Sequence, residues 1–349
     1  MTTRSFSRRA LRVLMVVSVL AGIAQIVAYT ALQADWEPGS VLRAAPYGAI
    51  AAAIAVCMSL LVTNDRRGNV RAARMIARSL VALTLSAFFY DVMFVEDTPL
   101  SSVFVFQFVL VVAYQMSNDP NLDRHNPRDG GFRGAIPLSF FNLFWIFVIC
   151  SVFGLFGETI VSFFRDGRWE SRAGFVIGPF SPIYGMGAVL ITAALNRIYD
   201  RNPFTIVLVG GVVGAAFEYF AGWFFESAFG IVAWSYEGQP LNFHGHTSVL
   251  QALVWGLIGL AWMKIALPRA MKLIDLIPLR ARVPVTLLGT VILLADAILT
   301  VLCLDCWFLR MSGEPIQTPW QELCARYFDD EFMQRRFETM SMWTILADR

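Results

Sequence analysis

Nine long apolar runs decide what this chain can fold into. A helix that crosses a bilayer needs about 20 apolar residues. With 57% hydrophobic and only 15% charged residues, the chain cannot bury these runs in one soluble core. The sequence therefore predicts an all-α, polytopic membrane helix bundle of about nine spans. The runs are Leu11–Leu32, Val41–Val62, Met75–Val95, Leu100–Met116, Pro137–Phe164, Gly174–Leu195, Phe204–Ala228, Thr247–Leu267 and Pro284–Cys303.

Three arginines precede the first run and Arg12 lies at its start, as in the basic part of a secretory signal peptide. The apolar part of the run, however, is about 20 residues long against about 7–15 in a signal peptide, and no small-residue cleavage site follows. We therefore expect Leu11–Leu32 to be an uncleaved span.

Loop charges predict the orientation of the spans. The N-terminus and loops 63–78 and 268–283 are rich in Arg, whereas the charged residues of loops 33–40 and 96–99 are all acidic. Because basic loops stay in the cytoplasm, we expect a plasma-membrane protein with a cytoplasmic N-terminus and, after nine crossings, an external tail. Three arginines fall outside against this trend: Arg165, Arg168 and Arg172.

A polar loop at Ser117–Ala135 separates the runs into two groups. We expect a four-span region at residues 1–135, a five-span region at 136–309 and a soluble amphipathic tail at 310–349. The apolar side chains of the tail share one helical face: Trp320, Leu323, Cys324, Tyr327 and Phe328.

Acidic residues inside the apolar runs are the most informative side chains, because a charge at the centre of a membrane helix costs about 2.5–3.5 kcal/mol. Two interpretations stay open. In the first, the acids form ion pairs or hydrogen bonds that fix helix packing, with the three external arginines as partners. In the second, the acids form a polar site for a substrate, ion or proton. The acids are Asp91, Glu158, Glu218, Glu226, Asp296 and Asp305.

Segment 167–187 is the most unusual stretch, because Gly178, Pro179 and Pro182 interrupt an apolar run. Backbone groups freed by such a break must bond to protein or line a wet cavity, and broken helices form ligand sites in transporters. A passive kink is the alternative. We expect these groups to face a polar cavity.

Other motifs carry weaker signals. Trp234 and Tyr236 suit a membrane interface, and His244 with His246 lacks the further ligands of a metal site. Cys303 and Cys306 fit helix packing better than a redox pair. No Walker-type nucleotide loop, protease signature or hydrolase motif occurs, so we expect no enzyme, no cofactor and no metal.

A short internal repeat is suggested by Phe156-Gly-Glu158 and Phe217-Glu218. Each ends an apolar run that enters an aromatic, polar loop and then returns. If this is a true repeat, the two hairpins run parallel and face each other.

These residues make the chain similar to a family of bacterial membrane proteins, the putative ABC-transporter permeases (type IV), over roughly residues 140–340. The likeness rests on Gly154–Glu158, on Arg172–Gly174 with Gly178–Gly187, and on blocks around Glu218 and Trp234. The chain departs from the family pattern at three positions, where relatives have cysteine, aspartate and arginine: Ser181, Ser235 and His246.

The resemblance implies a permease-like transport component, with the lipid bilayer and a separate nucleotide-binding ATPase subunit as partners, and it is compatible with an oligomer. The net charge of +2 excludes a nucleic-acid binder. Two alternatives stay open: an intramembrane enzyme with Glu218, Glu226 and His244 as acid–base groups, or a membrane scaffold or sensor with a docking tail. The candidate substrate or ion-site residues are Glu158, Arg172, Gly178, Pro179, Pro182, Tyr184, Glu218, Glu226, Trp234, Asn242 and His244.

Charge complementarity predicts a specific pair in this region. Arg172 lies in the loop between the runs that carry Glu158 and Glu218, and opposite charges attract strongly in an apolar setting. We expect Arg172 to pair with one of these acids and Glu226 to lie nearer the membrane surface.

The orientation is testable with reporter fusions after Arg78, Arg133 and Asp348. We expect internal signals at the first two positions and an external signal at the third. An internal signal at Asp348 would mean that one run, first of all Gly174–Leu195, does not cross the membrane.

Overall fold

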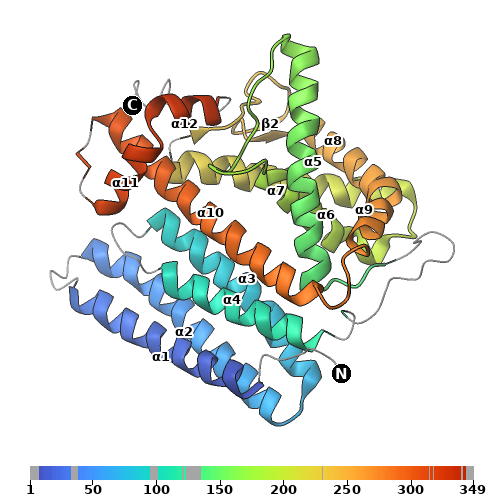
Figure 1. The fold of residues 1–349 in the computed structure, drawn as a ribbon. Helices are drawn as coiled ribbons and strands as arrows, with labels where there is room; N and C mark the ends of the chain where they lie inside the picture. Colours follow the sequence, from blue (N-terminus) through green and yellow to red (C-terminus); the bar gives the residue numbers. More distant parts are fainter. Residues whose placement is uncertain are drawn as a thin grey trace. The chain divides into compact units, whose positions relative to one another are not determined.

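The computed structural model describes residues 8–32, 38–94, 101–119, 122, 135–229, 231–313, 315–316, 318–338 and 341–342. The regular elements in this part of the chain are helices and four two-residue strands, joined by non-helical segments (Figure 1). It forms two compact units, the first made of Met1–Leu122 with Arg280–Val291 and the second of Asp123–Leu279 with Ile292–Arg349.

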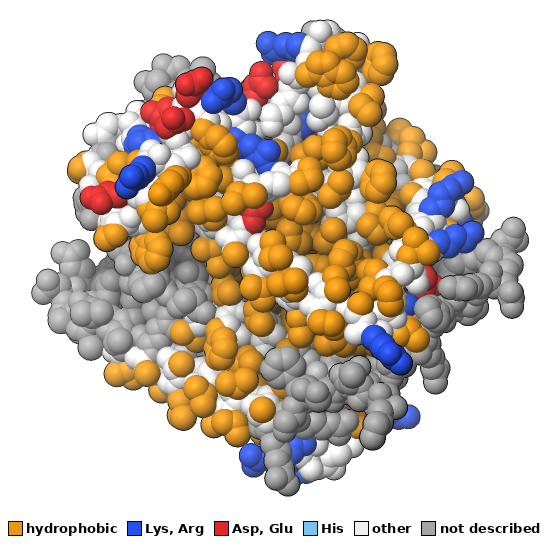
Figure 2. All heavy atoms as spheres, viewed as in Figure 1, with side chains coloured by type: hydrophobic (Ala, Val, Ile, Leu, Met, Phe, Trp, Pro, Cys, Tyr) orange, Lys and Arg blue, Asp and Glu red, His pale blue; other side chains and the backbone are white. Residues whose placement is uncertain are grey.

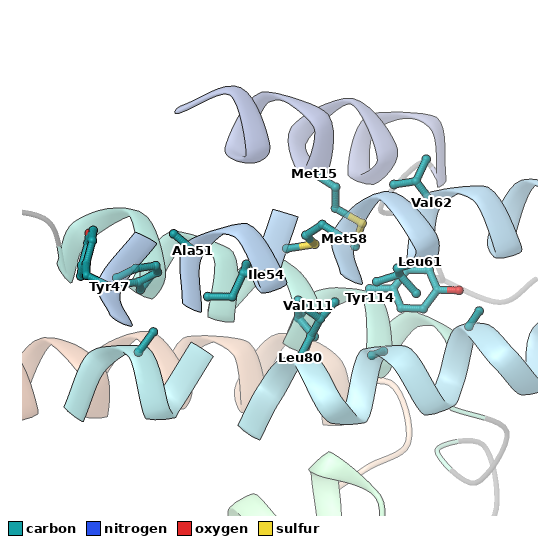
Figure 3. Packing of buried hydrophobic residues seen from close by; sticks show 14 residues of the cluster. Met15, Tyr47, Ala51, Ile54, Met58, Leu61, Val62, Leu80, Val111 and Tyr114 are labelled. Carbon is teal, nitrogen blue, oxygen red and sulfur yellow. The ribbon is translucent and has the colours of Figure 1, made fainter. Parts of the chain in front are cut away.

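The first unit is a closed arrangement of four helices, in which α1 packs on α2 and α4, and α3 packs on the same two helices. Its core is apolar, with Met15, Ile54, Met58, Leu80 and Val111 pointing into the space between the helices (Figure 3). The helices are α1 (Arg8–Leu32), α2 (Pro38–Arg66), α3 (Val70–Phe94) and α4 (Ser101–Asn118).

Polar side chains tie this bundle together at a few points. The Arg12 guanidinium lies 2.5 Å from the Asp65 carboxylate, which also accepts a hydrogen bond from the Tyr114 hydroxyl at 3.0 Å. Further inside, the Gln107 side chain donates to the Ser18 carbonyl at 3.2 Å. These contacts fix the N-terminal helices without forming a cluster of buried acids.

The second unit contains two helical hairpins, the end of a long helix and the tail. A π-helical turn at Trp262–Ala266 joins α8 to α9, and the strands pair antiparallel as β1 with β4 and β2 with β3. The elements are α5 (Phe140–Asp166), α6 (Pro182–Leu195), α7 (Pro203–Phe229), β1 (Ile231–Val232), β2 (Asn242–Phe243), β3 (Thr247–Ser248), α8 (Val249–Ala261), α9 (Leu267–Ile274), α10 (Arg282–Ser312), α11 (Pro319–Tyr327), α12 (Asp330–Arg336) and β4 (Ser341–Met342).

Six helices in the described residues are long and apolar enough to cross a membrane, and two shorter apolar helices cover Ala10–Ala24 and Val103–Asn118. Apolar side chains cover much of the face in Figure 2, and on α5 the Phe153 and Phe164 side chains are 66% and 82% exposed. An all-helical, multi-pass membrane protein is confirmed. The six are Ala45–Arg66, Val70–Tyr90, Phe140–Phe164, Pro203–Ser227, Val249–Ile274 and Arg282–Ser312.

The predicted run Gly174–Leu195 is not one helix, so a count of nine full-length spans is not supported. Gly178 has a φ of 72°, and the helix begins only at Pro182, leaving α6 with 14 residues. Before it, the Ser181 amide donates to the Ser151 carbonyl in the middle of α5 at 3.1 Å. The chain therefore returns along α5 in a non-helical segment before α6 begins.

The tail is also different from the single amphipathic helix that the sequence predicts. It forms two short helices, because the backbone leaves the helical conformation at Phe328 and the Asp329 side chain caps α12. Cys324 is buried, with its sulfur 3.3 Å from that of Cys303. Trp320 and Tyr327, predicted on the same face as Cys324, are 66% and 64% exposed.

Glycines allow α7 and α8 to pack with their backbones in contact. A Cβ at Gly211 would lie 2.5 Å from the Ala252 carbonyl oxygen, and a Cβ at Gly256 would overlap the Val207 carbonyl oxygen. Small residues of this kind permit close approach of membrane helices. This contact holds the second hairpin together.

The contact predicts a large cost for a side chain at Gly256. Gly256→Leu should separate α7 from α8 and lower the yield of monodisperse, detergent-extracted protein at least several-fold. Gly157→Leu is the matched control, since a Cβ there meets nothing within 4 Å. Equal yields of the two variants in fluorescence-detected size-exclusion chromatography would contradict this packing.

Candidate functional site

Arg172 is the centre of a charged network that joins α5, the non-helical segment and α6. Its Nη1 lies 3.3 Å from Oε1 of Glu158, and its Nη2 lies 2.8 Å from Oε2 of Glu170. Glu158 also accepts a hydrogen bond from the Tyr184 hydroxyl through its other oxygen. The predicted pairing of Arg172 with Glu158 is confirmed, and Arg168 adds a contact of 2.6 Å to Glu170 from the exposed side.

Glu218 on α7 lies in a different environment. The residue is 6% exposed. Its Oε1 accepts from the Tyr236 hydroxyl at 3.0 Å, and its Oε2 accepts from the Thr247 hydroxyl at 2.7 Å. The Trp255 side chain is a third hydrogen-bonding neighbour. Among the described residues, no Arg, Lys or His forms an ion pair with Glu218, so only neutral donors surround this buried carboxyl group.

Glu218 and Glu158 both influence the pKa of the same tyrosine, Tyr236. Burial is the largest cause that raises the pKa of Tyr236, and the negative charges of Glu218 and Glu158 raise it further. Tyr236 therefore stays protonated at neutral pH. It can donate its hydrogen bond to Glu218 throughout the physiological range.

Glu226 in the last turns of α7 has a histidine neighbour. His246 Nε2 lies 3.5 Å from its carboxylate, whose side chain is 30% exposed. The His246 carbonyl accepts from the Trp234 indole at 2.9 Å, which anchors this part of the loop. An imidazole therefore lies beside an acid near the end of α7.

The second histidine has a separate partner. His244 Nδ1 lies 3.1 Å from the Tyr219 hydroxyl rather than beside a carboxylate. In the part of the chain that the structure describes, no group of three or more His, Cys, Asp or Glu side chains could hold a metal ion. The residues of the H-x-H motif are therefore hydrogen-bonding groups of the loop.

Asn242 shapes the tight turn that precedes α8. Its side-chain amide donates to the Gln239 carbonyl at 2.9 Å, and its side-chain oxygen accepts from the Gly245 amide at 3.1 Å. Leu241 and His244 have positive φ angles of 54° and 49°, and such strained conformations need this local support. The turn directs Thr247 toward Glu218.

Side chains of α10 bind the broken segment before α6. The Val176 amide donates to Thr300 Oγ1 at 2.9 Å, and the Ile177 amide donates to Asp296 Oδ1 at 3.1 Å. The intramembrane acid Asp296 thus has a structural role, because it satisfies a backbone group that the break in the helix leaves free.

Arg336 from α12 binds the same segment from the other side. Its Nε donates to the Phe175 carbonyl at 2.8 Å, and its Nη2 donates to the Gly178 carbonyl. The Ser171 hydroxyl in turn donates to the Arg336 carbonyl at 2.7 Å. The backbone amide and carbonyl groups of residues 175–178 therefore bond to protein side chains. For these groups the expectation of a polar cavity is wrong.

Fold and site together define a class: a polytopic helical membrane protein with buried acids at the breaks of two helical hairpins. Residues 145–301 match the family model described as putative ABC-transporter type IV. The matched range contains Glu158, Arg172 and Glu218, so the resemblance predicted from their motifs is confirmed for this part of the chain. No curated protein and no solved structure matches the chain significantly.

Several residues that complete the site were not singled out from the sequence. Thr247 and Thr300 carry no pattern that separates them from ordinary helix or loop threonines. Glu170 and Arg336 look like solvated charges. For Arg336, the only available signal is its position at the end of a short helix that follows the long apolar run of α10.

The contacts of Arg336 predict that the tail protects segment 167–181. Arg336→Gln should increase the rate of tryptic cleavage after Arg168 and Arg172 several-fold in detergent-solubilised protein. Arg335→Gln is the matched control, because the Arg335 side chain is 72% exposed and pairs with Glu331 of the same helix. Equal cleavage rates in the two variants would show that Arg336 does not hold the segment.

Proposed function

We propose that the chain is a permease-like membrane transport component whose transport site lies around Glu218. The observation that carries this proposal is a nearly fully buried carboxyl group whose hydrogen-bonding neighbours are neutral: Tyr236, Thr247 and Trp255. The coarser description, a membrane protein of ABC-transporter type, comes from the family match.

Energetics distinguish Glu218 from a purely structural acid. Removing a charge from water costs several kcal/mol, and structural acids in apolar surroundings recover this cost through a cationic partner. Glu158 has such a partner in Arg172. Glu218 has none among the described residues, and acids of this kind in membrane segments mark ion and substrate pathways.

The backbone beside the site supports the same function. Non-helical segments precede both α6 and α8, and the residues next to these helix starts, Tyr184 and Thr247, contact Glu158 and Glu218. Transporters place their sites at discontinuous helices of this kind, because a break brings polar groups to membrane depth. Glu226 and His246 lie toward the end of α7, where they can form part of the access route.

The energy source is proposed to be a separate nucleotide-binding subunit. The sequence contains no Walker-type loop, and the family description names an ABC-transporter type. The apolar exteriors of the helices would contact lipid, with one face available to further copies or subunits.

The proposal predicts that Glu218→Gln keeps folded protein but removes function. The amide preserves shape and two hydrogen-bonding atoms while it removes the charge. The complex isolated through a tag from native membranes should show at least tenfold lower ATP hydrolysis in lipid vesicles, at an unchanged yield. Glu237→Gln, an exposed acid in the same loop region, is the control and should behave as the unmodified protein.

Arg172→Gln separates the structural from the functional acid. It leaves Glu158 and Glu170 without their shared cation, so it should lower the yield of folded protein. Combined with Glu218→Gln, it should not restore activity. Full activity of Glu218→Gln, or a complex without any ATP hydrolysis, would contradict the proposed function.

A further inference from the structure

The hairpins α5–α6 and α7–α8 have the same internal plan, which extends the short repeat predicted from the sequence. The first helices match at a constant separation of 60 residues. The identical pairs are Phe144 and Phe204, Ile146 and Ile206, Val152 and Val212, Gly154 and Gly214, and Glu158 and Glu218.

Contacts within the hairpins repeat as well. A Cβ at Gly154 would overlap the Tyr184 side chain, and a Cβ at Gly214 would overlap the Trp255 side chain in the same way. One residue further on, Gly185 lies against the Phe147 carbonyl, and Gly256 lies against the Val207 carbonyl. Phe147 and Val207 are again 60 residues apart, so sequence and packing define one register for both copies.

The polar groups follow this register. In the first copy the Tyr184 hydroxyl donates to Glu158. In the second copy Trp255, at the position equivalent to Tyr184, supplies a hydrogen-bonding side chain to Glu218. Each copy therefore carries one glutamate on its first helix with an aromatic hydrogen-bonding neighbour on its second helix.

The two copies differ in the other partners of the glutamate carboxylate. Glu158 is paired with the Arg172 guanidinium, which can donate hydrogen bonds but cannot accept one. Glu218 is bonded to the hydroxyls of Tyr236 and Thr247. A hydroxyl both donates and accepts, so these partners can serve a carboxylate and, after they rotate, a protonated carboxyl group.

We infer that the two hairpins are diverged copies of one repeat, and that, of their two equivalent glutamates, Glu218 is the one that takes up and releases a proton, while Glu158 is ion-paired with Arg172. The proton comes from water and adds to one carboxylate oxygen, which then donates a hydrogen bond to Tyr236 or Thr247. The role of this proton in transport rests on the proposed function; the protonation itself does not.

The titratable groups near Glu218 agree with this assignment. Tyr236 faces it from the loop, Tyr184 of α6 and Glu158 of α5 interact electrostatically with Tyr236, and no cation faces Glu218 among the described residues. On α7 itself, Glu226 has His246 as its neighbour.

Infrared spectroscopy of the purified full-length protein in lipid tests the inference. Difference spectra between acidic and alkaline buffer contain carboxylic-acid C=O bands from every acid that titrates, and one of these bands should belong to Glu218. Glu218→Gln should remove this band, and Glu158→Gln should leave it. Arg172→Gln should add a second band, because Glu158 then loses its cation. Asp296→Asn identifies any contribution from the other buried acid, which accepts a backbone hydrogen bond.

Each outcome is decisive for the inference. The inference would be overturned if Glu218→Gln lost no C=O band. It would also be overturned if the band assigned to Glu218 disappeared in Glu158→Gln. If the band behaves as expected while the ATP hydrolysis of the Glu218→Gln complex stays normal, the proton site stands and the proposed transport function fails. If hydrolysis falls but no band depends on Glu218, the function stands and the proton assignment fails.

Discussion

Polar groups among apolar membrane helices must find partners within the protein, because the membrane core offers no water. This requirement organises the second unit of the structure. Where Gly178 and the nearby prolines end helical bonding, side chains of α10 and α12 satisfy the backbone. The carboxyl groups on the helices have different partners: Glu158 pairs with a guanidinium, Glu218 accepts from neutral hydroxyls, and Asp296 accepts from a backbone amide. The difference between Glu158 and Glu218 is the basis on which we propose a structural role for the first and a functional role for the second.

Much of the fold follows from the sequence, because the length and apolarity of a run are local properties. The all-helical membrane class was predictable, as was the break in Gly174–Leu195, since glycine and proline act on their own backbone. How the freed backbone groups are satisfied was not predictable. That depends on Thr300 and Arg336, which lie more than a hundred residues away and reach the segment only through tertiary packing.

The candidate site shows the same limit. Charge alone predicted that Arg172 pairs with Glu158 or Glu218, and the structure places Glu158 3.3 Å away. The neutral partners of Glu218 carry no charge signal, so the sequence could not separate the two glutamates. A short sequence repeat already relates the two glutamates. The structure extends this relation to packing, because the contact of Gly154 with Tyr184 repeats as that of Gly214 with Trp255.

The central claim is that Glu218 binds a proton because the hydrogen-bonding partners of its buried carboxyl group, among the described residues, are neutral. The most direct measurement counts the protons released by the purified protein as the pH is raised, with a pH-indicator dye and with Glu218→Gln as the reference. The account predicts that the unmodified chain releases one more proton per chain than this variant. Equal release by the two proteins would contradict the claim.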